Sequence, residues 1–304
     1  MRHPRRAAIT ILFPLLALAA CGDDSPVDQG AATLPPVASS APSDPEPTAP
    51  APSEAPTRSY DVATGADDVV ISVTNEGGFV PIGVAFANTP VAMVTGDGRV
   101  LTTGPVIAIF PGPLLPNVQQ RSISPAGVQE LLARADELGL LAEVEYEDDP
   151  MIADAGTTIV TITVDGTTYR HEAYALGLDD ETDPARQALA DFVAAVSDLP
   201  ATVGDAELGP DEPFTSEQFL IQALPVEPET LGADGIEPTF VPWPADAPVQ
   251  LADAQECAAV PAAEFAPLFA DANTLTFFTE VDPVAGTETT YSVTPVQQLP
   301  GRSC

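Results

Sequence analysis

The stretch from Gly22 to Arg58 limits most strongly where this chain can fold. It contains nine prolines and no aromatic residue, and most of its other residues are Ala, Ser, Thr or acids. Such a composition has too little apolar surface to offset the entropy that a chain loses on ordering. We therefore expect residues 21–58 to form an extended tether of at most about 3.1 Å per residue, and the folded region to run from about Tyr60 to Cys304.

The first 20 residues predict a secretory signal peptide. Basic residues come first, residues 7–19 are apolar but too short to span a bilayer stably, and small residues follow. The closing sequence LAAC, with Ala20 before Cys21, resembles the lipobox of bacterial lipoproteins. The resemblance implies cleavage between Ala20 and Cys21 and a lipid on the Cys21 sulfur, which anchors an exported protein to the outer face of the cell membrane. The alternative is a soluble secreted protein in which this cysteine occurs by chance.

The charge balance excludes several classes of function. The formal net charge is -35, from 45 acidic and 10 basic residues. Because phosphate backbones are bound by clustered positive charge, we expect no nucleic-acid partner. The field favours a cation, a basic protein or a cell-wall partner, or it serves only to keep the surface solvated. The chain has no lysine, so it has no phosphate-binding loop of the usual type, no pyridoxal Schiff base and no Ser/Lys dyad.

Strand and helix signals begin directly after the tether. Alternating and β-branched residues predict strands at 69–73 and within 90–103, where a hairpin turn falls at the Asp-Gly pair 97–98. The sequence SISPAGVQELLARADELGLL predicts a helix that is capped by Ser124 and ends at Gly139, with apolar residues at helical spacing. These signals indicate a sheet with a helix packed on it.

A second hairpin is predicted around the Asp-Gly pair 165–166. That turn sets Val160 opposite His171, so the histidine falls on the apolar face of the sheet. A second helix is predicted to start after Asp183 and to end before Pro200. The order of the elements is therefore strand, helix, hairpin and helix.

The stretch 203–213 indicates a boundary, after which the theme recurs. A strand is predicted at 217–226, a Pro-interrupted helix at 261–272, and a hairpin at 274–299. We expect an α+β fold of antiparallel sheets with a few packed helices, divided into units 59–204 and 205–304. The recurring order also raises the hypothesis of an internal duplication.

Cysteine usage predicts a disulfide in the second unit. If Cys21 carries a lipid, Cys257 and Cys304 remain as an even pair in an exported protein. A disulfide between them ties the C-terminus to the start of the predicted third helix. The alternative, a reactive thiol, has no basic activator near it in the sequence.

The densest group of acids follows the first predicted helix. Glutamates at alternate positions share one face if the segment is a strand. The simpler interpretation is that this face is a solvated edge of the sheet. The sharper hypothesis is a divalent-cation site, although the spacing is not that of a known calcium loop. Its candidate ligands are Glu143, Glu145, Glu147, Asp148, Asp149 and Asp154.

Catalytic candidates are few. His171 is the one histidine after the signal peptide, and its place on an apolar face favours a packed core residue over a catalyst. No serine lies in a nucleophile-elbow motif, and two acids could serve in glycoside hydrolysis, although no spacing selects a pair. Trp243, in a proline-rich stretch, is either a ligand contact or the packing anchor of its own loop.

Five segments resemble a group of uncharacterised secreted lipoproteins of high-GC Gram-positive bacteria. They are GGFVP, GDGRV, GVQELLARADELGLL, TTYRHEAYALG and YSVTPVQQLPGRSC. The likeness covers nearly all of the folded region and implies the lipid anchor and the disulfide, but no activity. We expect a lipid-anchored cell-envelope protein whose domain is a non-catalytic binding or structural module; the alternative is a carboxylate-dependent envelope hydrolase.

Overall fold

The computed structural model describes residues 58–147, 152–178, 182–232 and 235–304. Every element below belongs to the compact unit Ala55–Cys304. Its described residues form twelve β-strands and five α-helices, which confirms the α+β fold class. The predicted signal peptide and the predicted lipid site both lie outside the described residues.

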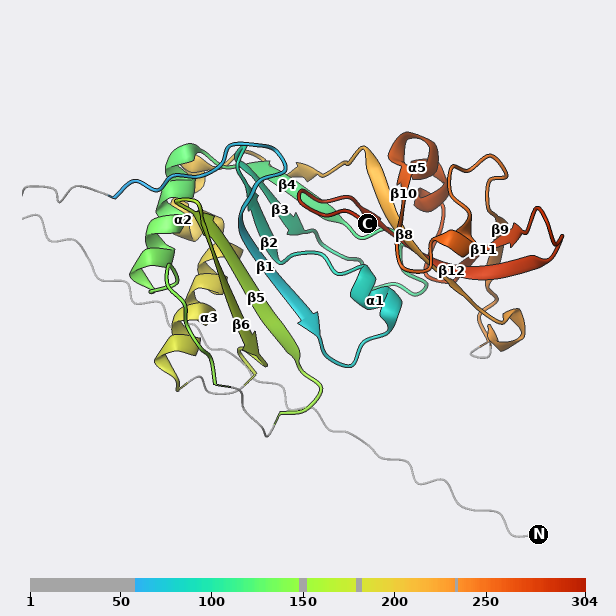
Figure 1. Cartoon of the computed structure of the whole chain (residues 1–304), viewed down its shortest axis with the longest axis horizontal. Helices are drawn as coiled ribbons and strands as arrows, with labels where there is room; N and C mark the ends of the chain where they lie inside the picture. The colour runs from blue at the N-terminus through green and yellow to red at the C-terminus, as the bar shows by residue number, and fades with distance from the viewer. Residues whose placement is uncertain (1–57, 148–151, 179–181, 233–234) are drawn as a thin grey trace, which may run out of the picture. The chain divides into compact units, whose positions relative to one another are not determined.

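A seven-stranded antiparallel sheet occupies the first part of this unit (Figure 1). Its strand order is β6-β5-β1-β2-β3-β4-β7. The strands are β1 (Val69–Gly77), β2 (Ala92–Thr95), β3 (Arg99–Thr103), β4 (Val118–Ser122), β5 (Gly156–Val164), β6 (Thr167–Tyr174) and β7 (Glu212–Pro213). The last strand comes from beyond the predicted unit boundary at residue 204, because β7 pairs with β4.

Helices α2 (Pro125–Glu137), α3 (Pro184–Ser197) and α4 (Leu199–Val203) pack on one face of this sheet (Figure 1). The predicted cap is present, because the Ser124 hydroxyl accepts a hydrogen bond from the Gly127 amide at 3.1 Å. Leu132 of α2 and Phe192 of α3 are fully buried against the sheet. Burial of such side chains contributes about 1.5–3 kcal/mol each to the stability of the fold. The apolar faces of the helices therefore stabilise their packing on the sheet.

The β5–β6 hairpin has the register that the sequence predicts. Asp165 and Gly166 both have positive φ, 51° and 73°, which is the geometry of a type I′ turn and the reason for glycine there. Val160 pairs with His171. The histidine side chain is consequently buried in the core.

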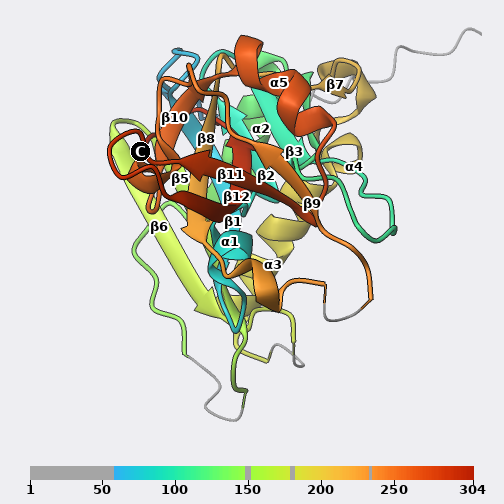
Figure 2. The ribbon, with the colours of Figure 1, turned by 90° about the vertical axis from the view of Figure 1, so that its right-hand side faces the viewer.

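A five-stranded sheet follows, with the order β10-β8-β12-β11-β9, and Figure 2 turns it toward the viewer. Its strands are β8 (Gln218–Pro225), β9 (Thr239–Pro242), β10 (Ala258–Pro261), β11 (Thr276–Val281) and β12 (Glu288–Gln297). The β9–β11 pair is parallel and the other pairs are antiparallel. This strand order does not repeat that of the first sheet, and the internal duplication stays a hypothesis.

Helix α5 (Ala262–Ala270) covers one face of the second sheet. Phe265 and Phe269 on this helix pack against Phe278 and Trp243 in a cluster of ring contacts. Short 3₁₀ turns at Asp205–Glu207, Pro228–Thr230 and Leu251–Asp253 join the elements. In the part of the chain that is described, no helix is long and apolar enough to cross a membrane.

Candidate functional site

The two cysteines of the folded unit are paired. Cys257 and Cys304 lie at disulfide distance, with their Cα atoms 5.3 Å apart. Cys257 directly precedes β10, which leads into α5, so the pairing ties the C-terminal segment to the edge of the second sheet.

His171 is held as a neutral core residue. Its Nε2 lies 2.9 Å from the Leu140 carbonyl, which can only accept, so Nε2 carries the proton. Nδ1 then accepts a hydrogen bond from the Tyr146 hydroxyl at 2.8 Å. Burial lowers the pKa of His171 despite the opposing effect of the Leu140 carbonyl. Both ring nitrogens are thus occupied by structural partners.

Trp243 is a packing anchor. Its side chain is buried, and its indole N–H donates to the Val249 carbonyl at 2.9 Å. The indole ring centroid lies 5.0 Å from that of Phe265. A tryptophan with a satisfied N–H inside an aromatic cluster stabilises its loop and offers no surface to a ligand.

The acidic segment after α2 is not a paired strand. Glu143, Glu145 and Glu147 are exposed, and the residues between them are half-buried, so the chain is extended without a neighbouring strand. Asp148 and Asp149 lie outside the described residues, and Asp154 has a positive φ of 59°. The described residues contain no group of three or more His, Cys, Asp or Glu side chains that could hold a metal ion. The cation site therefore remains a hypothesis without geometric support.

A different stretch of the chain is unusual for its lack of charge. Between Glu76 and Arg121 the charged residues are Asp97 and Arg99, although 18% of the whole chain is charged. These two residues pair with each other, with Arg99 Nε 2.8 Å from Asp97 Oδ2. The connections at 78–91 and 104–117, which we call the β1–β2 loop and the β3–β4 loop, carry no charge.

Both uncharged loops leave the same end of the first sheet. Ala92 at the start of β2 pairs with Val73 in the middle of β1 and with Thr102 near the end of β3, so β1 runs on beyond β2 toward the same end. The hydroxyls of Thr89 and Thr103 lie 2.8 Å apart, which holds the bases of the two loops together. The antiparallel order of the strands thus brings two segments that are distant in sequence side by side.

Large apolar side chains on these loops face solvent. We call the following six residues the apolar rim, and their exposed fractions run from 58% to 91%: Phe79, Ile82, Val106, Ile107, Ile109 and Phe110. Single exposed apolar residues are common, but six of them on two neighbouring loops of a folded protein point to an interaction surface.

A cavity of about 890 Å³ opens between the two loops and the second sheet. We call it the α1 groove, after the short helix α1 (Ile82–Phe86) within the β1–β2 loop. Its walls include Val84 on α1 and Leu114 on the β3–β4 loop, and Ser292 and Thr294 on β12 form part of its floor. Of the described residues that line the groove, none is charged, and the polar ones are neutral Asn, Ser and Thr.

The walls of the groove are fastened to the second sheet. An alanine Cβ at position 83 would lie 2.8 Å from Thr294 Oγ1, so Gly83 permits α1 to lie directly on β12. In the β3–β4 loop, the Gly112 amide donates to Thr274 Oγ1 at 3.2 Å, and the Thr274 amide donates to the Gly112 carbonyl at 2.9 Å. Both walls are therefore placed by contacts between segments far apart in sequence.

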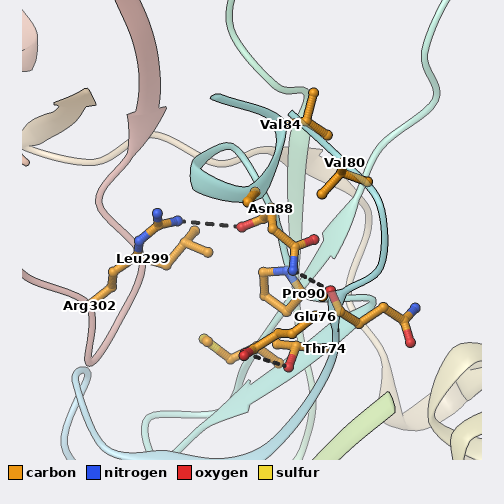
Figure 3. Close-up of a pocket in the computed structure, with 12 residues that line it drawn as sticks. Thr74, Glu76, Val80, Val84, Asn88, Pro90, Leu299 and Arg302 are labelled. Atoms are coloured by element: carbon orange, nitrogen blue, oxygen red, sulfur yellow. Dashed lines mark hydrogen bonds between the residues drawn. The ribbon is translucent and has the colours of Figure 1, made fainter. Parts of the chain in front are cut away.

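A second cavity, of about 490 Å³, lies on the other side of α1 (Figure 3). Arg302 reaches toward it and donates to the carbonyls of Phe86 at 2.6 Å and Asn88 at 3.4 Å. Its guanidinium also lies 5.1 Å from the Phe86 ring centroid. Burial lowers the pKa of Arg302, yet a guanidinium stays charged. Arg302 thus serves to fasten the end of α1, since a cation suits the carbonyls that close a helix.

The chemistry of the α1 groove is that of a binding site. A groove lined by apolar side chains and a few neutral hydroxyl and amide groups suits an uncharged chain with a small polar part. Nucleophilic or acid–base catalysis needs a titratable pair within hydrogen-bond reach of the substrate. The described lining of the groove has no such pair.

Comparison with protein-family models, with curated proteins and with solved structures found no match to this chain. The site therefore has to be interpreted from its own geometry. No catalytic or metal-binding motif points to the groove or the rim, because the described residues of both are uncharged. The signal that points to both is the run from residue 77 to 120, which is almost free of charge in a strongly acidic chain.

Proposed function

We propose that this protein is a lipid-anchored module of the cell envelope that binds an apolar chain, such as the acyl or alkyl part of an amphiphile, in the α1 groove. The observation that carries the proposal is the neutral lining of this groove. The anchor is the lipid expected on Cys21, and the resemblance to bacterial lipoproteins supports it.

The size of the groove supports a chain-like ligand. Its volume of about 890 Å³ lies within the range of about 300–1,000 Å³ that is typical of small-molecule sites. Each buried methylene contributes about 0.8 kcal/mol, so a ligand gains affinity with the length of its apolar chain. A short polar metabolite gains little from such a surface.

Hydrolysis is the weaker candidate. A glycosidase-type mechanism needs two carboxyl groups about 5–10 Å apart around the substrate, and the described residues that line the groove offer none. The geometry therefore favours binding without chemical change of the ligand.

The test is titration of the full chain with a dansyl-labelled fatty acid, followed by fluorescence. Ser292 is half-buried on the floor of the groove, and Ser292→Phe fills the space that the chain would occupy. We expect this substitution to weaken binding at least tenfold.

Ser72→Phe is the matched control for the groove variant. Ser72 is also a half-buried serine in a strand, but it lies on β1 and does not line the groove. We expect Ser72→Phe to bind the fatty acid as the parent does. Equal affinity of the parent and Ser292→Phe, with both chains folded, would remove the groove as the binding site.

A further inference from the structure

We propose that the apolar rim is a membrane-docking surface, which enters the outer part of a lipid bilayer and places the mouth of the α1 groove against it. The occupant of this surface is the lipid bilayer itself. The proposal rests on the proposed function in one respect, that the anchor keeps the domain near a membrane, and its test does not use the anchor.

The composition of the two loops that carry the rim suits a bilayer interface. A bilayer interface accepts apolar side chains but opposes buried charge, because ions lose their hydration there. The β1–β2 and β3–β4 loops carry no charged residue. Phe79 and Phe110 are 91% and 64% exposed, so they can enter lipid without any rearrangement of the core.

The negative charge of the chain also limits which part of its surface can approach a bilayer. A chain of formal net charge -35 is repelled by anionic lipids, and this repulsion falls off over a Debye length of about 10 Å at 0.1 M salt. Each of the two loops carries no acid over its whole length, although the exposed acids Glu76 and Asp154 lie beside the start of the β1–β2 loop. The molecule can therefore approach a bilayer with these two loops first.

The rim and the α1 groove are continuous with each other. Ile82, Val106 and Ile107 belong to the rim and also line the α1 groove. The groove consequently opens within the surface that touches lipid. An apolar chain can then pass between the bilayer and the groove without crossing water, where each exposed methylene is costly.

The chain before the described residues is long enough for the rim to reach the membrane that holds the anchor. The chain enters the fold at Arg58, which pairs with Asp165 in the β5–β6 turn at the opposite end of the sheet from the rim. The tether must therefore span at least the length of β1, which is about 30 Å for its nine residues. The stretch from Gly22 to Arg58 can reach on the order of 100 Å if extended, which lets the rim turn back to the membrane that holds the anchor.

The test is flotation with phosphatidylcholine vesicles, using the full chain with Cys21→Ala so that no lipid is attached. Every chain carries this change, so any contribution from residues 1–20 is constant. Phe110→Asp and Phe79→Asp place a charge on the rim at positions that do not line the groove. We expect each to reduce vesicle binding at least tenfold.

Val284→Asp is the matched control for the rim variants. Val284 is 95% exposed in the β11–β12 connection, so the substitution adds the same charge to an apolar surface position away from the rim. We expect it to change vesicle binding less than twofold. Absence of flotation of the parent chain, or equal flotation of the parent and Phe110→Asp, overturns the proposal and leaves a protein partner as the occupant of the rim.

Two further measurements separate this proposal from the proposed function. Phe110→Asp should still bind the dansyl fatty acid, because Phe110 does not line the groove, and Ser292→Phe should still float with vesicles. Loss of both activities in one rim variant would contradict a separate docking surface. With vesicles of phosphatidylglycerol, binding should be weaker than with phosphatidylcholine at low salt, and added salt should reduce the difference.

Discussion

Connections at both ends of the seven-stranded sheet join neighbouring strands, but the turns at one end are charged and the β1–β2 and β3–β4 loops at the other end are uncharged. At one end, the β2–β3 and β5–β6 turns carry Asp97 and Asp165, which pair with Arg99 and Arg58. At the other end, the β1–β2 and β3–β4 loops carry the apolar rim. A connection between antiparallel strands needs residues that form a turn and that are well solvated, and the charged turns have both properties.

This difference shows that the rim is not a requirement of the fold. A loop that serves only to connect two strands gains nothing from exposing phenylalanine and isoleucine to water. Such residues also create a risk of aggregation, which proteins normally avoid on their surfaces. The apolar end of the sheet is therefore best explained by a contact that the isolated chain does not show.

The largest expected effect is on the free energy of unfolding, for which a core phenylalanine is compared with a rim phenylalanine. Phe192 is fully buried between α3 and the sheet, whereas Phe110 is 64% exposed on the rim. We expect Phe192→Ala to lower the free energy of unfolding by about 3–5 kcal/mol and Phe110→Ala to change it by less than about 0.5 kcal/mol. Urea unfolding followed by circular dichroism measures both values. A loss above 2 kcal/mol on the rim would mean that Phe110 supports the fold.

The next effect concerns the link between the apolar end and the C-terminus. Arg302 fastens the end of α1, and Cys304, two residues later, is paired with Cys257. Cys257→Ser/Cys304→Ser opens a loop with a sequence separation of 47 residues, for which the chain-entropy treatment gives about 4 kcal/mol. We expect this loss in urea unfolding, together with weaker binding of the dansyl fatty acid because α1 loses part of its support.

Two thiols titrating in the unfolded parent chain, prepared without reductant and with Cys21→Ala, would contradict the disulfide. Normal binding by the double-serine variant would show that α1 holds its place without the C-terminal segment.

The smallest expected effect is the pH dependence of stability that the buried His171 causes. The pKa of His171 is lowered in the fold by burial, whereas in the unfolded chain it is about 6.5. Below pH 6.5 the unfolded state binds a proton that the folded state resists. Stability is therefore fully present above that pH and falls with decreasing pH, by at most about 1.4 kcal/mol per pH unit.

The readout for His171 is the slope of the unfolding free energy between pH 7 and pH 5, before carboxyl groups titrate. His171→Leu should be less stable than the parent at pH 7 but should lack this slope. An equal slope in both chains would show that another group causes the pH dependence.

Local signals predicted much of this fold. The Ser124 cap and the apolar spacing of α2 depend on residues within a few positions of one another. The same is true of the turn at Asp165 and Gly166, from which the burial of His171 follows. The alternation of side chains along a hairpin leaves one register that buries the apolar set. Predictions of this kind need no knowledge of distant parts of the chain.

Elements that depend on distant partners were missed. Strand β9 has four residues and ends in a proline, and it exists because Phe240 and Val241 pair with β11 in parallel. Strand β7 has two residues and is defined by pairing with β4. Helix α1 has five residues, none of them buried, and its place depends on β12 and Arg302. Propensity is too weak to specify such short elements.

The sequence by itself determined the acidic character of the chain and the hairpins and helices that short-range patterns encode. It also contained the uncharged run around the rim. Only the tertiary structure decided that this run forms two neighbouring loops around one groove and that Trp243 is a core residue. The reason is physical: turns and caps arise from neighbours in sequence, whereas a groove arises from the pairing of strands that lie far apart along the chain.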